Sequence, residues 1–213
     1  MYHVHWPDVH TPLKETAEAM HQLLRQGKIR AIGLSNFDVE MMEAFQKIAP
    51  LHVLQPPFNL FEREIENKEL AYCLKKGIAT LGYGSICRGL LSGKMHPKRE
   101  FKGDDLRKVD PKFKHPHFAS YLECNDRLSK WAKEKYNRPL PALAVRWVLD
   151  KGISVALWGG RTPEQMDVIG EIDGWKLGEK DFKEIDALIN ECIKEPIGPE
   201  FMAPPHRKEK THL

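Results

Sequence analysis

Residues 27–37, Gly27-Lys28-Ile29-Arg30-Ala31-Ile32-Gly33-Leu34-Ser35-Asn36-Phe37, decide the fold class of the 213-residue chain. The apolar run Ile29–Leu34 at their centre predicts a short buried strand, bounded by a glycine and by polar residues. Gly27 ends a helical stretch before this strand, and Asp38 precedes a second helical stretch after it. A buried strand between two helices favours parallel pairing, because parallel strands need long crossovers.

The same order recurs along the chain. Strands are expected at Tyr2–His5, Ile29–Leu34, Val53–Gln55, Ala79–Leu81 and Ser154–Leu157. Helices are expected from a Thr11 cap with Pro12 at the first position to Gly27, at Val39–Ile48, Ile65–Lys76, Asn125–Tyr136 and Ala142–Asp150, from Thr162 with Pro163 at the first position, and around Phe182–Cys192. These βα units predict an α/β fold of parallel strands with outer helices, about five units of a (β/α)8 barrel that typically needs roughly 250 residues. A doubly wound open sheet is the structural alternative, although no GxGxxG motif follows a strand.

Composition predicts one soluble domain spanning residues 1–213, with 41% hydrophobic and 30% charged residues. The 33 basic and 30 acidic residues are interspersed, which argues against a nucleic-acid binder. No apolar run of about 18 residues predicts a membrane span, and no signal peptide opens the chain. Four cysteines without a CxxC pair favour reduced thiols in a cytoplasmic protein over a disulfide framework or a zinc site.

Polar or aromatic residues follow each predicted strand, where parallel α/β folds place their ligands. The segments are HWP (5–7), GLSNF (33–37), QPPFNL (55–60), GYGS (82–85) and WGGR (158–161). The interval Lys94–His117 breaks the alternation of strands and helices, because it is rich in Lys, Asp, Pro and His and lacks helical periodicity. A flap over a ligand is the functional interpretation of this interval, and a mobile surface loop is the alternative.

In this order and spacing the chain resembles the aldo-keto reductases. The matching motifs are HWPD (5–8), GKIRAIGLSNF (27–37), LQPPFNLFERE (54–64), LGYGSICRGLLSGK (81–94) and WGGRTPEQ (158–165). GDDLRKVDPKF (103–113) and PIGPEFMAPP (196–205) are especially similar to the bacterial NADP-dependent reductases related to general stress protein 69. The resemblance implies the C-terminal five-eighths of a barrel that reduces aldehydes and ketones with NADP(H), without metal or flavin.

The resemblance assigns roles to the first strand ends. His5 matches the catalytic histidine that hydrogen-bonds the substrate carbonyl. Trp6 is expected to form a wall of the substrate pocket, with a packed aromatic residue as the structural alternative. Ser35, Asn36 and Gln55 match residues that bind the nicotinamide carboxamide, and Tyr83 matches the aromatic ring that stacks on the nicotinamide. Helix capping by Ser35 and Asn36, and core packing by Tyr83, are the structural alternatives. His3 is predicted to be structural.

The later motifs match the phosphate and adenosine contacts. Gly84, Ser85, Ile86, Cys87 and Arg88 match a loop whose amides approach the pyrophosphate, with Arg88 adding charge. Gly159, Gly160 and Arg161 precede the predicted helix at Thr162, whose free amides favour an anion. Arg161 and Gln165 match the contacts with the 2′-phosphate and the adenine, which favours NADP(H) over NAD(H). A surface charge is the alternative role for Arg161.

The family's proton donor, a Tyr tuned by a Lys–Asp pair, belongs to segments that precede HWP, and none of these three residues can be assigned in this chain. We therefore expect an N-terminally truncated domain, with carbonyl reduction lowered roughly 10²–10⁴-fold by the loss of acid catalysis. The strand Tyr2–His5 and the last strand are expected to be open edges that favour self-association. The two hypotheses are an enzyme completed by another segment or chain, and a non-catalytic NADP-binding or interaction protein, such as a channel β-subunit or a decayed gene product.

Overall fold

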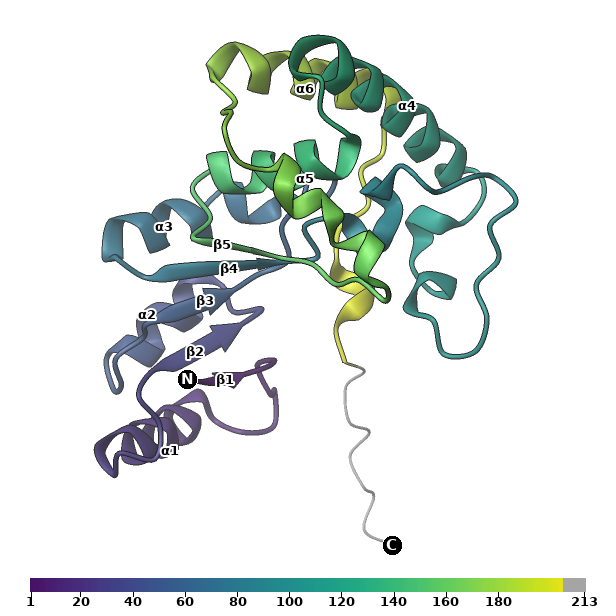
Figure 1. Ribbon diagram of the computed structural model, residues 1–213. Coiled ribbons are helices and arrows are strands. Elements are labelled where there is room, and N and C mark those ends of the chain that lie inside the picture. The colour runs from purple at the N-terminus through teal and green to yellow at the C-terminus, as the bar shows by residue number, and fades with distance from the viewer. Residues whose placement is uncertain (205–213) are drawn as a thin grey trace, which may run out of the picture.

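Five parallel strands pair in the order in which they follow one another along the chain. They are β1 (Tyr2–Val4), β2 (Ile32–Ser35), β3 (Val53–Gln55), β4 (Ala79–Tyr83) and β5 (Val155–Leu157). The structure, a computed structural model, describes residues 1–204 (Figure 1). Its register places Tyr2 opposite Ile32, Gly33 opposite Val53 and Leu81 opposite Val155.

The strand order excludes the doubly wound alternative. In a doubly wound sheet the order reverses at a switch point, whereas here every crossover moves one strand further in the same direction. The prediction of a parallel α/β sheet with the progression of a barrel wall is therefore confirmed. Within residues 1–204, β1 and β5 each have a strand neighbour on one side only.

Helices cover the sheet in two groups. They are α1 (Leu13–Arg25), α2 (Val39–Gln46), α3 (Glu69–Lys76), α4 (His117–Tyr136), α5 (Leu140–Asp150) and α6 (Glu179–Cys192). Figure 1 shows α1, α2 and α3 along the strands, and α4, α5 and α6 gathered beyond β5. One core cluster contains Ile32, Leu34 and Phe45, and the second surrounds Trp147 and Tyr121.

Short 3₁₀ helices fill the connections between these elements. They are η1 (Glu64–Glu66), η2 (Cys87–Ser92), η3 (Leu106–Lys108), η4 (Pro111–Phe113), η5 (Pro163–Gln165), η6 (Asp167–Glu171) and η7 (Glu200–Met202). Two of them, η3 and η4, interrupt the segment Lys94–His117, which we call the flap. The flap otherwise has no regular structure between Lys94 and Pro116, as its sequence predicts.

Several helix starts differ from the prediction, among them that of α5, which begins at Leu140 and not at Ala142. The helix expected from Asn125 begins at His117, because Phe118 and Tyr121 extend the buried stripe of α4 toward the flap. The helix expected at Thr162 is reduced to the short η5 and η6, neither of which buries a residue that would anchor an α-helix. Thr11 does not cap α1, since its hydroxyl donates to Asp8 (3.1 Å) and the helix begins at Leu13 after Pro12.

Three adjustments concern element ends. β2 starts at Ile32 and not at Ile29, and the stretch predicted as a helix from Ile65 is a 3₁₀ turn before α3 begins at Glu69. β4 continues to Tyr83, two residues beyond its predicted end. The longer β4 places Tyr83 in the sheet, and this position matters for the site.

Candidate active site

A chain of hydrogen bonds joins the carboxyl ends of the first four strands. Asn36, directly after β2, donates from Nδ2 to the carbonyl oxygen of His5 (3.0 Å) and to Ser35 Oγ (3.1 Å). The Ser35 hydroxyl donates to the carbonyl oxygen of Gln55 at the end of β3 (2.7 Å), and the Tyr83 hydroxyl donates to Asn36 Oδ1 (2.9 Å). The structure therefore brings together His5, Ser35, Asn36, Gln55 and Tyr83, which the sequence separates by up to 78 residues.

Two features fix the orientation of this hydrogen-bond chain. Asn36 adopts a left-handed backbone (φ 64°), a conformation that asparagine tolerates better than most residues. Burial, assisted by the negative charge of Glu62, raises the pKa of Tyr83 to about 12. Tyr83 therefore keeps its proton at neutral pH and remains the donor to Asn36.

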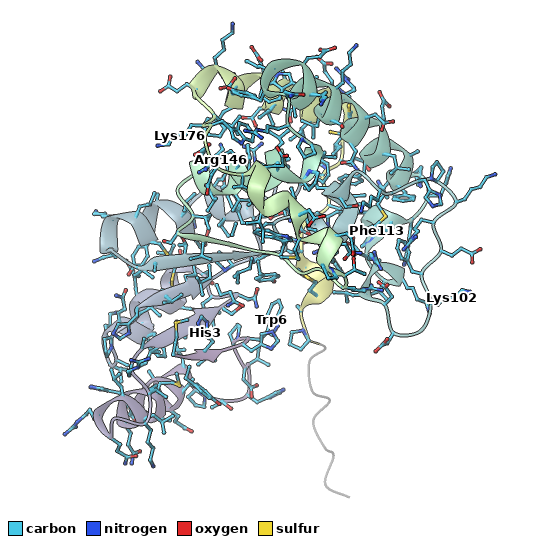
Figure 2. All side chains as sticks on the ribbon, in the orientation of Figure 1. His3, Trp6, Lys102, Phe113, Arg146 and Lys176 are labelled. Carbon is cyan, nitrogen blue, oxygen red and sulfur yellow. The ribbon has the colours of Figure 1, made fainter. Side chains whose placement is uncertain are left out.

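His5 and Trp6 stand at the open side of these strand ends. His5 is exposed, and its ring centroid lies 6.3 Å from that of the half-buried Trp6. Figure 2 labels Trp6 beyond the end of β1, whereas His3 lies within the strand. Burial lowers the pKa of His3, whose ring nitrogens have no hydrogen-bond partner among the described residues. A neutral ring packed against Gly33 is consistent with the structural role predicted for His3.

A cleft of about 850 Å³ begins at Tyr83 and extends between the flap and the end of β5. Seven predicted contact residues line it: Tyr83, Gly84, Ile86, Arg88, Gly159, Arg161 and Gln165. Its charged lining comprises five basic residues (Arg88, Lys94, Arg99, Arg107, Arg161) and two acidic ones (Asp105, Glu164). The volume falls within the range of small-molecule sites, and the excess of basic groups suits an anionic ligand. His5, Trp6, Ser35, Asn36 and Gln55 lie outside this lining.

The flap contacts the far side of the cleft through Asp105. Arg107 donates to this carboxylate from Nε (2.8 Å), and Arg161 Nη2 lies 3.7 Å from it. Arg161 itself is 78% exposed, so its guanidinium is available to a ligand. The Arg161 amide donates to the side chain of Gln165 (2.7 Å), which closes the turn before η5. Because η5 is a single 3₁₀ turn, the α-helix N-terminus that was predicted to favour an anion here is not formed.

The loop Gly84–Gly89, which we call the β4 loop, follows β4 into this cleft. Ser85 is buried beneath it, where its hydroxyl donates to the carbonyl of Gly82 (3.1 Å) and its amide to that of Leu157 (3.1 Å). The Cys87 side chain is also fully buried, and burial raises the pKa of its thiol. These two side chains point away from the cleft, so only their backbone can face a ligand. Gly160 is exposed beside Met166 and does not line the cleft.

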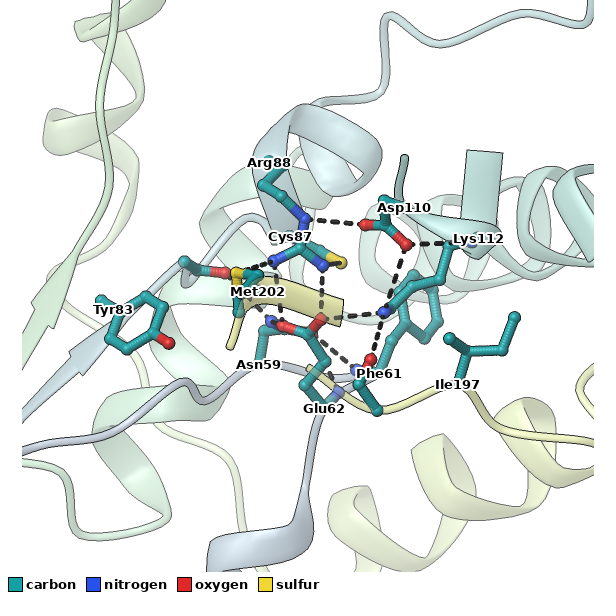
Figure 3. Close-up of polar contacts among 12 residues, drawn as sticks. Asn59, Phe61, Glu62, Tyr83, Cys87, Arg88, Asp110, Lys112, Ile197 and Met202 are labelled. Atoms are coloured by element: carbon teal, nitrogen blue, oxygen red, sulfur yellow. Dashed lines mark hydrogen bonds and ion pairs between the residues drawn. The ribbon is translucent and has the colours of Figure 1, made fainter. Parts of the chain in front are cut away.

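The guanidinium of Arg88 does not have the free charge that its predicted contact with the pyrophosphate requires, because it pairs with carboxylates of the protein. Its guanidinium donates to Asp110 (2.8 Å from Nε) and to both carboxylate oxygens of Glu62, one of them at 3.3 Å. Lys112 completes the group, with Nζ 2.9 Å from Glu62 and 3.5 Å from Asp110. We call these four residues the buried charge cluster, since Glu62, Asp110 and Lys112 have no exposed side-chain surface and Arg88 only 13% (Figure 3).

The sequence analysis missed Glu62, Asp110 and Lys112. Glu62 lies between Phe61 and Arg63 in a motif that matches the family as a whole, and the other two lie in the interval that the sequence predicts as a flap over a ligand or as a mobile surface loop. One signal is that Glu62 and Lys112 are charged residues directly beside the aromatic residues Phe61 and Phe113. A charged side chain that is buried together with such a neighbour requires a charged or hydrogen-bonding partner. The partner of each charge is far away in sequence, and this separation hides the pairing.

Comparison with known proteins identifies the family. The model of the aldo/keto reductase family matches residues 1–190, and the chain belongs to this family. It is 52% identical over 210 residues to the aldo-keto reductase YhdN of Bacillus subtilis, covering 98% of this chain and 63% of the relative. It is 29% identical to the NADH-specific methylglyoxal reductase of Escherichia coli, covering 78% of this chain and 51% of that enzyme.

Solved structures agree with this assignment. The glycerol dehydrogenase AKR11B4 from Gluconobacter oxydans superposes with a TM-score of 0.84 at 45% identity, over 94% of this chain and 61% of that one. An aldo-keto reductase from Klebsiella pneumoniae shares the fold, with a TM-score of 0.64 at 24% identity, and was solved with NADP and acetate. The chain thus spans 51–63% of the length of these proteins and comprises part of their (β/α)8 barrel.

Within residues 1–204 no helix is long and apolar enough to cross a membrane. The same residues contain no group of three or more His, Cys, Asp or Glu side chains arranged to hold a metal ion.

Proposed function

We propose that this chain binds NADP(H) in the cleft and forms the cofactor side of an oxidoreductase site that reduces aldehydes and ketones to alcohols. The observation that carries the proposal is the lining of the cleft, because Tyr83, Arg161 and Gln165 all line this one cavity. These are the residues that the resemblance assigns to the nicotinamide and to the adenosine phosphate, and family membership supports a nicotinamide cofactor.

The residues present fit this cofactor. The basic lining of the cleft suits the charges of two bridging phosphates and a 2′-phosphate, and the exposed guanidinium of Arg161 is free to form bidentate hydrogen bonds. Ser35, Asn36 and Gln55 offer amide and hydroxyl groups at the Tyr83 end. Asn36 already donates both of its Nδ2 hydrogens, so binding of a carboxamide oxygen there requires the exchange of one of these bonds, whereas Oδ1 accepts from Tyr83 and has a second lone pair for a carboxamide NH₂ group. When bound, the reduced nicotinamide supplies a hydride.

His5 is proposed to hold the carbonyl oxygen of the substrate, with Trp6 as a wall. The Asn36 side chain fixes the backbone of His5 to the strand ends, so the imidazole projects from an anchored position. A hydrogen bond from this ring stabilises negative charge as it develops on the substrate oxygen. Because no proton-donor Tyr with its Lys and Asp is assigned in these 213 residues, we expect carbonyl reduction by this chain alone to be roughly 10²–10⁴-fold below that of a complete site.

The remaining proposals concern the protein as a whole. We propose that residues 1–213 act as a single domain, that it self-associates through the open edges of β1 and β5, and that it resides in the cytoplasm. The four cysteines are unpaired, which is consistent with a reducing compartment.

Titration with NADPH, followed by cofactor fluorescence, tests the cofactor proposal. We expect saturable binding at micromolar NADPH, weaker binding of NADH, and loss of this preference in Arg161→Gln. Family membership does not decide the preference, because the Escherichia coli relative is NADH-specific. Lys176→Gln, an exposed substitution outside the cleft lining, serves as the control. Absence of saturable NADPH binding contradicts the proposal, and rapid turnover of 4-nitrobenzaldehyde contradicts the expected loss of acid catalysis.

A further inference from the structure

Four segments that are distant in sequence meet at the buried charge cluster. Glu62 follows β3, Arg88 belongs to the β4 loop, and Asp110 and Lys112 lie in the flap (Figure 3). The fourth segment, residues 197–202 near the C-terminus, contacts the cluster from one side. Lys112 donates to the carbonyl of Gly198 (3.1 Å), and the Phe201 ring lies 5.0 Å from the Arg88 guanidinium.

The charged groups of the cluster are paired almost entirely with one another. Asn59 donates to Glu62 Oε2 (2.7 Å), so this carboxylate accepts from Arg88, Lys112 and an amide. Burial alone would raise the pKa of Glu62, but the positive charges of Arg88 and Lys112 outweigh it, and the net shift is downward. The cluster is therefore a neutral set of two anions and two cations. Removal of one member leaves an uncompensated buried charge.

The backbone at Arg88 needs such support. Cys87 and Arg88 have φ angles of 46° and 53°, and Gly89 continues with 87°. The left-handed region is strained for two successive non-glycine residues, and such strain persists only where the surroundings determine it. The ion pairs of Arg88 with Glu62 and Asp110 hold this residue at the turn.

We propose that Glu62, Asp110 and Lys112 are positioning residues, and that through them Arg88 sets the backbone of the β4 loop that faces the cleft. This inference rests on the proposed function of the cleft as the NADP(H) site. Arg88 then affects the cofactor through the position of the loop amides, and not through an ion pair with a phosphate. Its guanidinium charge is already neutralised by two carboxylates, unlike that of Arg161, which is 78% exposed.

The proposal extends to the C-terminal segment. Residues 197–202 do not line the cleft, yet Gly198, Phe201 and Met202 contact Lys112 or Arg88 on the opposite side of the loop. We therefore expect changes in this segment to weaken cofactor binding without touching the cofactor.

Glu62→Gln and its matched control Glu15→Gln test the inference, because Glu15 is an exposed carboxylate of α1 that belongs neither to the buried charge cluster nor to the cleft lining. Hydrogen exchange of the cofactor-free protein gives the first readout: we expect Glu62→Gln to accelerate exchange of the β4 loop amides by about tenfold or more, with β2 unchanged. NADPH titration gives the second, with a dissociation constant raised roughly tenfold. Glu15→Gln should match the wild type in both.

A salt series separates positioning from direct contact. Arg88→Gln should weaken NADPH binding while leaving its dependence on ionic strength as in the wild type, whereas Arg161→Gln should flatten that dependence. If Glu62→Gln does not fold, Phe201→Leu perturbs the cluster from its rim and should accelerate exchange of the same loop amides.

The outcomes are distinct. The inference is overturned if the amides of the β4 loop exchange at the wild-type rate in a folded Glu62→Gln or Phe201→Leu variant. It is also overturned if the salt dependence of NADPH binding flattens in Arg88→Gln as it does in Arg161→Gln. Failure of the wild type to bind NADPH overturns the proposed function instead, and the exchange experiment still decides whether the cluster positions the loop.

Discussion

Replacement of Asn36 provides a quantitative test of the hydrogen-bond chain across the strand ends. Its side chain forms three hydrogen bonds, with His5, Ser35 and Tyr83, and its backbone is left-handed at φ 64°. Asn36→Gly removes the hydrogen bonds but tolerates the backbone conformation. Asn36→Ala removes the same hydrogen bonds and also places a Cβ in the left-handed region. Comparison of the two variants separates the two contributions.

The expected magnitudes follow from these contacts. A hydrogen bond between neutral groups contributes about 0.5–1.5 kcal/mol net, so losing three at this half-buried position should cost Asn36→Gly about 2 kcal/mol. The left-handed conformation costs alanine roughly 1–2 kcal/mol, and glycine's greater freedom in the unfolded chain offsets about half of it. Asn36→Ala should therefore lose about 3 kcal/mol in total. For a chain of this size, 1 kcal/mol corresponds to roughly 2–4 °C in Tm.

Urea unfolding, followed by circular dichroism, measures the loss of unfolding free energy in both variants. Tyr83→Phe removes only one of the three hydrogen bonds and should cost about 1 kcal/mol. Equal stabilities for Asn36→Gly and Asn36→Ala would refute the backbone argument. Wild-type stability in Asn36→Gly would refute the hydrogen-bond argument, because the three contacts would then contribute nothing beyond their interactions with water.

Three further predictions concern the hydrophobic core, the loss of stability at low pH and the edges of the sheet. Trp147→Ala should lower the free energy of unfolding by roughly 3–5 kcal/mol in urea melts, since this ring is fully buried and packs on Phe58 at 5.0 Å, whereas Trp147→Phe should cost less. Because the folded pKa of Glu62 lies below its ordinary 4.5, its carboxylate stabilises the fold above that pH and the contribution is lost as pH falls through the folded pKa. Stability measured from pH 7 to pH 3 should therefore fall less steeply in Glu62→Gln, and an unchanged slope counts against this assignment. Light scattering should show association of the wild type through its strand edges, reduced by Tyr2→Lys or Val155→Lys, whose native side chains are 56% and 44% exposed; a wild-type monomer contradicts this prediction.

The sheet was predictable because each strand is a short apolar run between turn-forming residues. Ile32–Ser35 and Val53–Gln55 are buried on nearly every residue, the pattern expected of parallel strands covered on both faces. The start of α4 was not predictable in this way, because His117 follows a polar flap and its helical stripe becomes visible only with Phe118 and Tyr121 packed in the core. At Thr162 the local signals for a helix are present, but no buried face supports one.

The grouping of several candidate residues was predictable from their places at strand ends. Tyr83, Arg161 and Gln165 line one cleft although 82 residues separate the first from the last. The orientation of Arg88 was not predictable, because it depends on Glu62 and on Asp110 in the flap. Pairing over such distances leaves no periodic trace in the sequence, and only the folded chain shows which charges neutralise one another.

The buried charge cluster also constrains the order of events during synthesis. Glu62 and Arg88 leave the ribosome first, and their ion pair has no Lys112 beside it until the flap has been translated. The carbonyl of Gly198, which accepts a hydrogen bond from Lys112, is translated 86 residues after Lys112 itself. Contacts over such sequence separations are closed late, since the intervening chain must first be ordered. A nascent chain arrested before Gly198 should therefore carry a β4 loop that is still protease-sensitive, and completion of the last turn should protect it.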